Sequence, residues 1–108
     1  MMELVRTFDA LGDQTRFAIV ERLVTGEATI TDLAAAHGMT LAGALKHVRV
    51  LEGAGLVSRS KRGRSVWCAL RPGQIRRISE WAQQYSEFWD TQLDALSVHL
   101  QPTAEGRD

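Results

Sequence analysis

Basic residues are concentrated in one stretch of the sequence, residues 39–71. This stretch holds seven of the thirteen lysines and arginines of the chain, whereas its one acidic residue is Glu52. The seven are Lys46, Arg49, Arg59, Lys61, Arg62, Arg64 and Arg71. Lysine and arginine side chains bind phosphate groups, and either one also donates to the major-groove edge of guanine. The chemistry that these residue types favour is therefore contact with a nucleic-acid duplex.

The apolar pattern of this stretch predicts the two elements that would hold the cations. Residues 41–53 carry apolar residues at helical spacing, with Ala44, Val48 and Leu51 facing the core. Residues 56–70 alternate between apolar and polar positions on either side of a glycine, which predicts a β-hairpin with cations at its turn. A helix followed by a cationic hairpin is the arrangement of a winged helix, a part that lies against a duplex.

Three shorter helices are predicted before the helix at 41–53, at residues 3–11, 14–25 and 29–36. The apolar face of the second is Phe17, Ile19, Val20, Leu23 and Val24. A turn containing Gly38 joins the third to the helix at 41–53, which is the helix-turn-helix arrangement. With the long helix described next, the predicted fold class is mainly α: a winged helix-turn-helix of five helices and a two-stranded wing.

A long helix is predicted at residues 74–100, after Pro72-Gly73. Apolar residues recur along one side of it at steps of three and four, from Ile75 to Leu100. A helix of this length spans about 40 Å, more than the diameter of so small a domain. We expect two copies of the chain to cover the stripe by pairing. The expected interface residues are Leu4, Phe8, Trp81, Tyr85, Phe88, Trp89, Leu93 and Leu96.

DNA contacts are expected from the exposed side of helix 41–53 and from the hairpin turn. The candidates are Thr40, Ala42, Leu45, Lys46, His47 and Arg49 in the helix, and Lys61, Arg62 and Arg64 at the turn. Lys46 and Arg49 carry donors for guanine edges or phosphates, whereas Leu45 has only an apolar contact to offer, for instance with a thymine methyl. His47 has two interpretations, a phosphate contact or packing beneath the helix. The alternative for the cations is that they are solvated charges on an ordinary surface.

Three segments together resemble the ArsR/SmtB family of winged-helix transcriptional repressors. They are ALGDQTRFAIVERL at 10–23, TDLAAAHGMTLAGALKHVRVLEGAGLV at 31–57 and GRSVWCALRP at 63–72. The resemblance implies a homodimer that binds operator DNA near its own promoter and represses transcription. It places the DNA-reading residues of the family on Thr40, Ala42, Leu45, Lys46 and His47. Leu45 departs from the family pattern, which often has Ser at this position.

Neither a metal nor a cofactor is expected. Metal sensors of this family carry Cys-x-Cys at the position of residues 30–32, or Asp-x-His with a second His on the last helix, and neither motif occurs here. Cys68 is expected in the core rather than as a redox switch. An enzyme is not expected either, because the chain lacks a Gly-rich phosphate loop, a nucleophile elbow and paired carboxylates. The alternatives are a ligand- or metal-responsive repressor and a winged-helix module for protein interaction.

Length and composition fit one small domain, residues 1–100, followed by a polar tail at 101–108. The chain has 108 residues, no net charge and one cysteine. A single cysteine excludes an internal disulfide and fits the reducing cytoplasm. No apolar run approaches the ~20 residues of a membrane-spanning helix, so no membrane contact is expected. From Ile78 onward the charged residues are Glu80, Glu87, Asp90, Asp94, Glu105 and Asp108 against Arg107.

Overall fold

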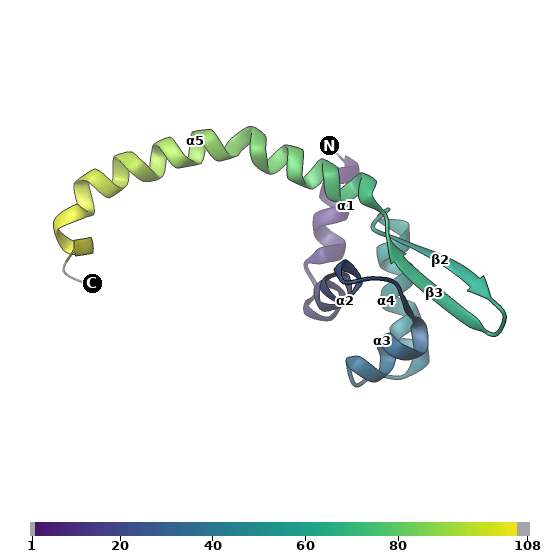
Figure 1. The fold of residues 1–108 in the computed structure, drawn as a ribbon. Coiled ribbons are helices and arrows are strands. Elements are labelled where there is room, and N and C mark those ends of the chain that lie inside the picture. Colours follow the sequence, from purple (N-terminus) through teal and green to yellow (C-terminus); the bar gives the residue numbers. More distant parts are fainter. Residues whose placement is uncertain (1, 106–108) are drawn as a thin grey trace. The chain divides into compact units, whose positions relative to one another are not determined.

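The computed structural model describes the backbone of residues 2–105, with the side chains of these residues except Trp89 and 97–105. Within this range five helices and three strands follow one another along the chain (Figure 1). They are α1 (Met2–Leu11), α2 (Gln14–Val24), β1 (Ala28–Thr29), α3 (Ile30–Ala36), α4 (Leu41–Gly53), β2 (Val57–Arg62), β3 (Ser65–Leu70) and α5 (Pro72–Glu105). The predicted fold class of five helices and a hairpin wing is confirmed, and the chain forms two units that meet between Arg77 and Ile78.

The sheet of the first unit has three strands in the order β1-β3-β2. Both pairings are antiparallel: Ala28 faces Cys68 between β1 and β3, and Val57 faces Leu70 between β2 and β3. The hairpin of β2 and β3 is the predicted wing. The two-residue strand β1 was not predicted, because two residues are too short to show an alternating pattern and their pairing depends on β3.

The core of the first unit lies between the helices and the inner face of the sheet. The predicted core residues of α4, Ala44, Val48 and Leu51, are all buried, and Ile30 and Leu33 of α3 are buried with them. Leu56, Val57 and Cys68 complete the core from the wing side, each fully buried. Burying these apolar side chains stabilises the unit and fixes which side of α4 is left for solvent.

The apolar face predicted for α2 is partly wrong. Ile19, Val20 and Leu23 are buried, but Phe17 is 49% exposed and Val24 is 70% exposed. A helix turns about 100° per residue, so both residues lie about a quarter-turn or more from the middle of the buried face. In α1 the buried residues are Thr7 and Ala10.

Thr7 is the buried polar residue of α1, and its hydroxyl donates to the carbonyl of Glu3 at 2.9 Å. The same oxygen lies 3.4 Å from the Ala54 carbonyl and 3.4 Å from Oε1 of Gln74. A buried hydroxyl is tolerated only where such partners satisfy it. Thr7 therefore ties α1 to the end of α4 and to the first turn of α5.

Three helices begin at a residue whose side chain caps the first turn. The Asp13 carboxylate accepts from the backbone N–H of Arg16 at 3.0 Å. Thr29 and Asp32 form a reciprocal capping box at the start of α3. Thr40 accepts from the N–H of Gly43 at 3.0 Å and so caps α4. These side chains satisfy backbone donors that the first helical turn leaves unpaired.

The second unit consists of α5 from Ile78 onward. Its exposed apolar side chains include Trp81, Tyr85, Phe88, Leu93 and Leu96, whereas the side chain of Trp89 lies outside the described residues. The rings of Trp81 and Tyr85 lie 5.4 Å apart, centre to centre. The helix runs to Glu105, past the predicted end at residue 100. None of the helices among the described residues is long and apolar enough to cross a membrane.

Candidate nucleic-acid interface

The outward side of α4 presents the predicted helix contacts to solvent. Ala42, Lys46 and Arg49 are exposed, opposite the buried residues of the same helix. Leu45 and His47 are half-buried and lie at the two edges of this side. Gly43 fits the first turn closely, because a Cβ on it would lie 3.2 Å from the capping hydroxyl of Thr40. The start of α4 thus combines small residues with the positive end of the helix dipole, which suits close approach to a phosphate.

His47 lies at the edge of α4 that faces α2. Its Nδ1 is 3.9 Å from the carboxylate of Asp13, too far for a hydrogen bond, and it has no hydrogen-bond partner among the described residues. The backbone N–H of Arg16, together with the charge of that arginine, lowers the pKa of the Asp13 carboxyl. The anionic Asp13 at the start of α2 thus lies beside His47 of α4.

Arg49 lies toward α1, one turn beyond Lys46. It lines an open hollow of about 270 Å³ together with Arg6, Asp9 and Val50. Arg49 is therefore placed beside charged groups of α1, whereas Lys46 is on the part of α4 nearer its capped start. The sequence predicts Lys46 and Arg49 as equal candidates for DNA contact, but their surroundings in the structure differ.

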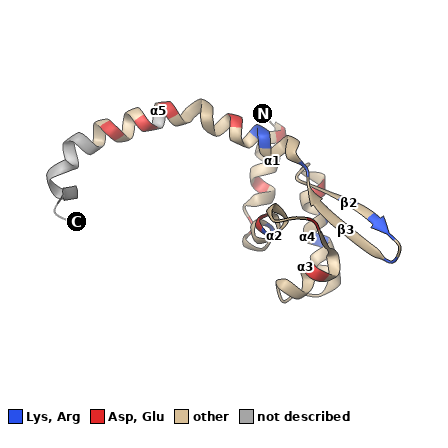
Figure 2. Cartoon of the chain, in the orientation of Figure 1, with Lys and Arg blue, Asp and Glu red and all other residues tan. Residues whose placement is uncertain are grey.

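The wing turn consists of Gly63 and Arg64, which connect the paired residues Arg62 and Ser65. Gly63 has φ of 63°, and among the described residues only glycines have positive φ. A positive φ at the first of two turn residues is the requirement of a type II′ hairpin turn, which glycine meets without strain. Lys61 and Arg64 are exposed, and Figure 2 shows basic residues at this end of the wing.

Arg62 is held by contacts within the fold. Its guanidinium donates to both carboxylate oxygens of Glu27, at 2.8 and 2.9 Å, and lies 5.3 Å from the centre of the Trp67 ring. The hydrogen bonds from Arg62 lower the pKa of the Glu27 carboxyl, and Glu27 in turn raises the pKa of Arg62. A bidentate pair of this kind fixes the orientation of both groups. It fastens β2 to the loop before β1.

A groove separates the start of α4 from the wing. It has a volume of about 310 Å³ and is lined by Ile30, Thr31, Leu41, Ala42, Leu45, Arg64, Ser65 and Val66. Three predicted DNA contacts, Ala42, Leu45 and Arg64, thus line one groove although up to 22 positions separate them. Thr31, Ser65 and Val66 were not predicted as part of the site. Sequence spacing carries no signal for them, because Thr31 belongs to α3 and Ser65 and Val66 belong to β3, and only the folded chain brings these elements beside the start of α4.

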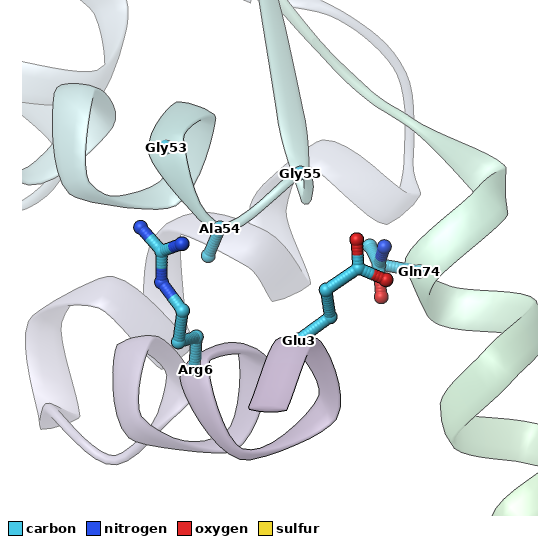
Figure 3. Close-up of a pocket in the computed structure, with 6 residues that line it drawn as sticks. All are labelled: Glu3, Arg6, Gly53, Ala54, Gly55 and Gln74. Carbon is cyan, nitrogen blue, oxygen red and sulfur yellow. The ribbon is translucent and has the colours of Figure 1, made fainter. Parts of the chain in front are cut away.

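A smaller pocket of about 140 Å³ lies between α1, the end of α4 and the first turn of α5. Figure 3 shows the side chains of Glu3, Arg6 and Gln74 around it. Glu3 is ion-paired with Arg77, and Gln74 is near the hydroxyl of Thr7. Gly55, with φ of 77°, has the side chain of Gln74 against it, within 2.9 Å of where a Cβ would be. The contacts of this pocket hold three helices together, and they do not identify a ligand.

Cys68 lies in the core, facing Ala28 and Arg59 in the neighbouring strands. Burial raises the pKa of its thiol, which disfavours the reactive thiolate. Among the described residues, no group of three His, Cys, Asp or Glu side chains is close enough together to hold a metal ion. The chemistry of the first unit is thus that of a cationic surface built on a winged helix-turn-helix.

Comparison with known proteins identifies the class and then the family. A helix-turn-helix domain model matches residues 11–59. The chain is 32% identical over 85 residues to the HTH-type transcriptional regulator NmtR of Mycobacterium tuberculosis, which covers 79% of this chain and 71% of NmtR. The fold is similar to the crystal structure of an ArsR family transcriptional regulator, with 34% identity, a TM-score of 0.74, and coverage of 82% of this chain and 97% of that one.

A homodimeric winged helix-turn-helix DNA-binding domain from Mycobacterium bovis is also similar, with 25% identity, a TM-score of 0.66 and coverage of 79% of each chain. The fold and the cationic surface define a DNA-binding transcriptional regulator of the winged helix-turn-helix class. The chain belongs to the ArsR/SmtB family. The resemblance found in the sequence is therefore confirmed.

Proposed function

We propose that this protein is a homodimeric repressor that binds an inverted-repeat operator near its own promoter. The observation that carries the proposal is the groove between α4 and the wing, with Lys46 exposed on the helix and Arg64 on the opposite wall. A recognition helix and a cationic loop held side by side match the two kinds of contact that operators receive, base edges and phosphates. A regulator of this kind works where the DNA is, so we place it in the cytoplasm.

The first half of α4 enters the major groove in this proposal. Ala42 and Leu45 face base edges, Lys46 donates to a guanine or a phosphate, and Thr40 adds a hydroxyl contact at the helix start. Lys61 and Arg64 grip the backbone beside the minor groove. His47, Arg49 and Arg62 lie at the edges of this footprint, where their neighbours are Asp13, the α1 hollow and Glu27.

The proposed dimer interface is the apolar stripe of α5. Its described members are Trp81, Tyr85, Phe88, Leu93 and Leu96, each more than a third exposed, and Trp89 continues the stripe in the sequence. Leu4 and Phe8 are apolar residues one turn apart on α1, and we assign them to the same purpose. The homodimeric state of the Mycobacterium bovis relative supports this assignment. Two-fold symmetry would present two α4 helices to half-sites about 34–36 Å apart.

The test is fluorescence anisotropy with a labelled duplex from the region upstream of the gene and unlabelled scrambled duplex as competitor. Binding should survive the competitor and weaken about 10³-fold or more between 50 and 200 mM salt if six or more phosphates are contacted. Reversal of Lys46 and Arg64 to Glu should weaken binding at least about 30-fold, since each contact is worth about 1–3 kcal/mol.

Arg76→Glu is the matched control, because Arg76 is an exposed cation outside α4 and the wing. It should leave binding within a few-fold of the wild type. If the double reversal binds the duplex as tightly as Arg76→Glu does, this DNA surface is wrong. Salt-insensitive behaviour with no DNA preference would instead favour a protein-interaction module, for which the exposed aromatic side chains of α5 are the surface.

A further inference from the structure

We propose that the groove between α4 and the wing reads the 5-methyl group of thymine, and that Leu41 and Leu45 are the residues that read it. The inference rests on the proposed function, because it requires α4 to enter the major groove. It adds the chemical feature of the operator that this chain selects.

The surface of the groove is apolar where bases would be read. Leu41 is 55% exposed at the very start of α4, and Leu45, one turn later, lines the same groove with Val66 of β3. Leaving a large apolar side chain in water is unfavourable, and contact with another apolar group would offset that cost. Residues at the start of a recognition helix are those that reach base edges. The position of Leu41 is thus suited to a base contact.

The major groove has few apolar partners to offer. Guanine presents acceptors, cytosine a donor and adenine one of each, whereas thymine adds a methyl group to its acceptor. The range 41–53 has no Asn, Gln or Ser that would form the usual amide or hydroxyl contacts. The 5-methyl of thymine is therefore the base feature that Leu41 and Leu45 are able to recognise.

The charges around the groove fit DNA rather than an apolar peptide. Arg64 lines the groove from the wing, and Lys46 is exposed on the adjacent turn of α4. Phosphates lie on both sides of every major-groove methyl, so cations beside an apolar floor complement a duplex. Thr31 and Ser65, which line the same groove, add hydroxyl donors for phosphate oxygens.

The experiment replaces single thymines by 2′-deoxyuridine, which removes the methyl group and leaves base pairing unchanged. A duplex is first selected from a random double-stranded library with the full-length protein, and each thymine of that duplex is then replaced in turn. We expect one or two thymines in each half-site at which the loss of the methyl group raises the Kd about threefold to fourfold. This is the change in affinity expected when one buried apolar carbon is removed.

Three variants assign that effect to the groove. In Leu41→Ala and Leu45→Ala the selected duplex should bind more weakly, and the difference between thymine and deoxyuridine at the sensitive position should disappear. Val50→Ala is the matched control: Val50 is an exposed apolar residue of the same helix, 41% exposed, but it lines the hollow toward α1. This variant should keep the full methyl effect. Thermal unfolding of each variant establishes that it is folded.

The two levels of the argument fail in different ways. If selection enriches no duplex and binding is indifferent to salt, the proposed function is wrong and the methyl reading is wrong with it. If a duplex is bound specifically but no thymine is sensitive to deoxyuridine, the methyl reading is overturned while the regulator stands. The methyl reading is also overturned if both leucine variants still distinguish thymine from deoxyuridine as strongly as Val50→Ala does.

Discussion

The three cations of the wing turn differ in what they contact. Arg62 is engaged by Glu27 and lies over Trp67, whereas Lys61 and Arg64 form no ion pair among the described residues. The charge of Arg62 is thus partly neutralised before any DNA arrives. We expect Arg62 to position the wing, and Arg64 to contribute charge directly to DNA binding.

The salt dependence of binding separates these two roles. Each phosphate contact that is lost reduces the slope of log K against log salt by about one. Arg64→Gln should therefore weaken binding and reduce the slope. Arg62→Gln should weaken binding with little change in slope, because it loosens the wing without removing a phosphate contact. Anisotropy titrations at four salt concentrations check this, and equal slopes for the two variants would show that their roles do not differ.

The pair of Glu27 and Arg62 also predicts a pH dependence of stability. Hydrogen bonds from Arg62 hold the pKa of Glu27 below its ordinary value of 4.5 in the folded protein. As pH falls below that value the unfolded chain takes up a proton more readily than the folded one, so the stabilisation present at neutral pH is lost. Glu27→Gln should therefore show a smaller fall in urea midpoint between pH 6 and pH 3.5 than the wild type.

Glu21→Gln is the control for this experiment, because Glu21 is an exposed glutamate at the outer side of α2 with no described ion pair. It should follow the wild-type pH dependence. The assignment is contradicted if Glu27→Gln and Glu21→Gln lose urea stability in parallel as pH falls.

At the scale of elements, the Thr40 cap determines where the recognition helix begins. Thr40→Ala should lower the free energy of unfolding by about 1 kcal/mol, while Thr40→Ser should be close to wild type. Thr29→Ala removes the equivalent cap of α3 and should cost a similar amount. Urea unfolding measures these changes in stability. Anisotropy titration compares the DNA affinities of the two alanine variants, and we expect affinity to fall more for Thr40→Ala than for Thr29→Ala. Equal losses of affinity would mean that Thr40 acts through stability alone.

Local features of the sequence predicted most helix bounds and the hairpin, because each depends on a few neighbouring residues. Gly63 is an example, since the positive φ of a hairpin turn is a property of a single turn. The contact between Arg62 and Glu27 was not predictable in this way, as 35 positions separate the residues. The groove that brings Leu45 and Val66 together has the same origin. Strand β1 also depends on a distant partner, β3.

The charges of the two units differ at the scale of the whole molecule. The wing and α4 of the first unit hold most of its exposed cations, whereas α5 from Ile78 to Glu105 carries Glu80, Glu87, Asp90, Asp94 and Glu105 and has no lysine or arginine. Figure 2 shows acidic residues along this helix. An acidic surface is repelled by phosphates, so the second unit is unsuited to DNA and available for association between copies of the chain.

In the proposed dimer, association of the two copies depends on the apolar side chains of α5. Leu93 and Leu96 are 58% and 53% exposed, and burying each in a dimer would contribute about 1.5–3 kcal/mol. Leu93→Glu combined with Leu96→Glu should convert the dimer to a monomer at micromolar concentration, as sedimentation equilibrium would show. Unfolding of the wild type should shift to higher urea as protein concentration rises, and this shift should vanish in the double variant.

Gln83→Glu provides the control for added charge, because Gln83 is exposed and lies two positions from both Trp81 and Tyr85, on the side of the helix away from the apolar stripe. It should remain dimeric. The monomeric double variant should bind a duplex with one half-site about as weakly as a duplex with two, since its α4 and wing are intact but no longer joined by symmetry. A double variant that stays dimeric would place the interface elsewhere, and Leu4 and Phe8 of α1 would be the next residues to change.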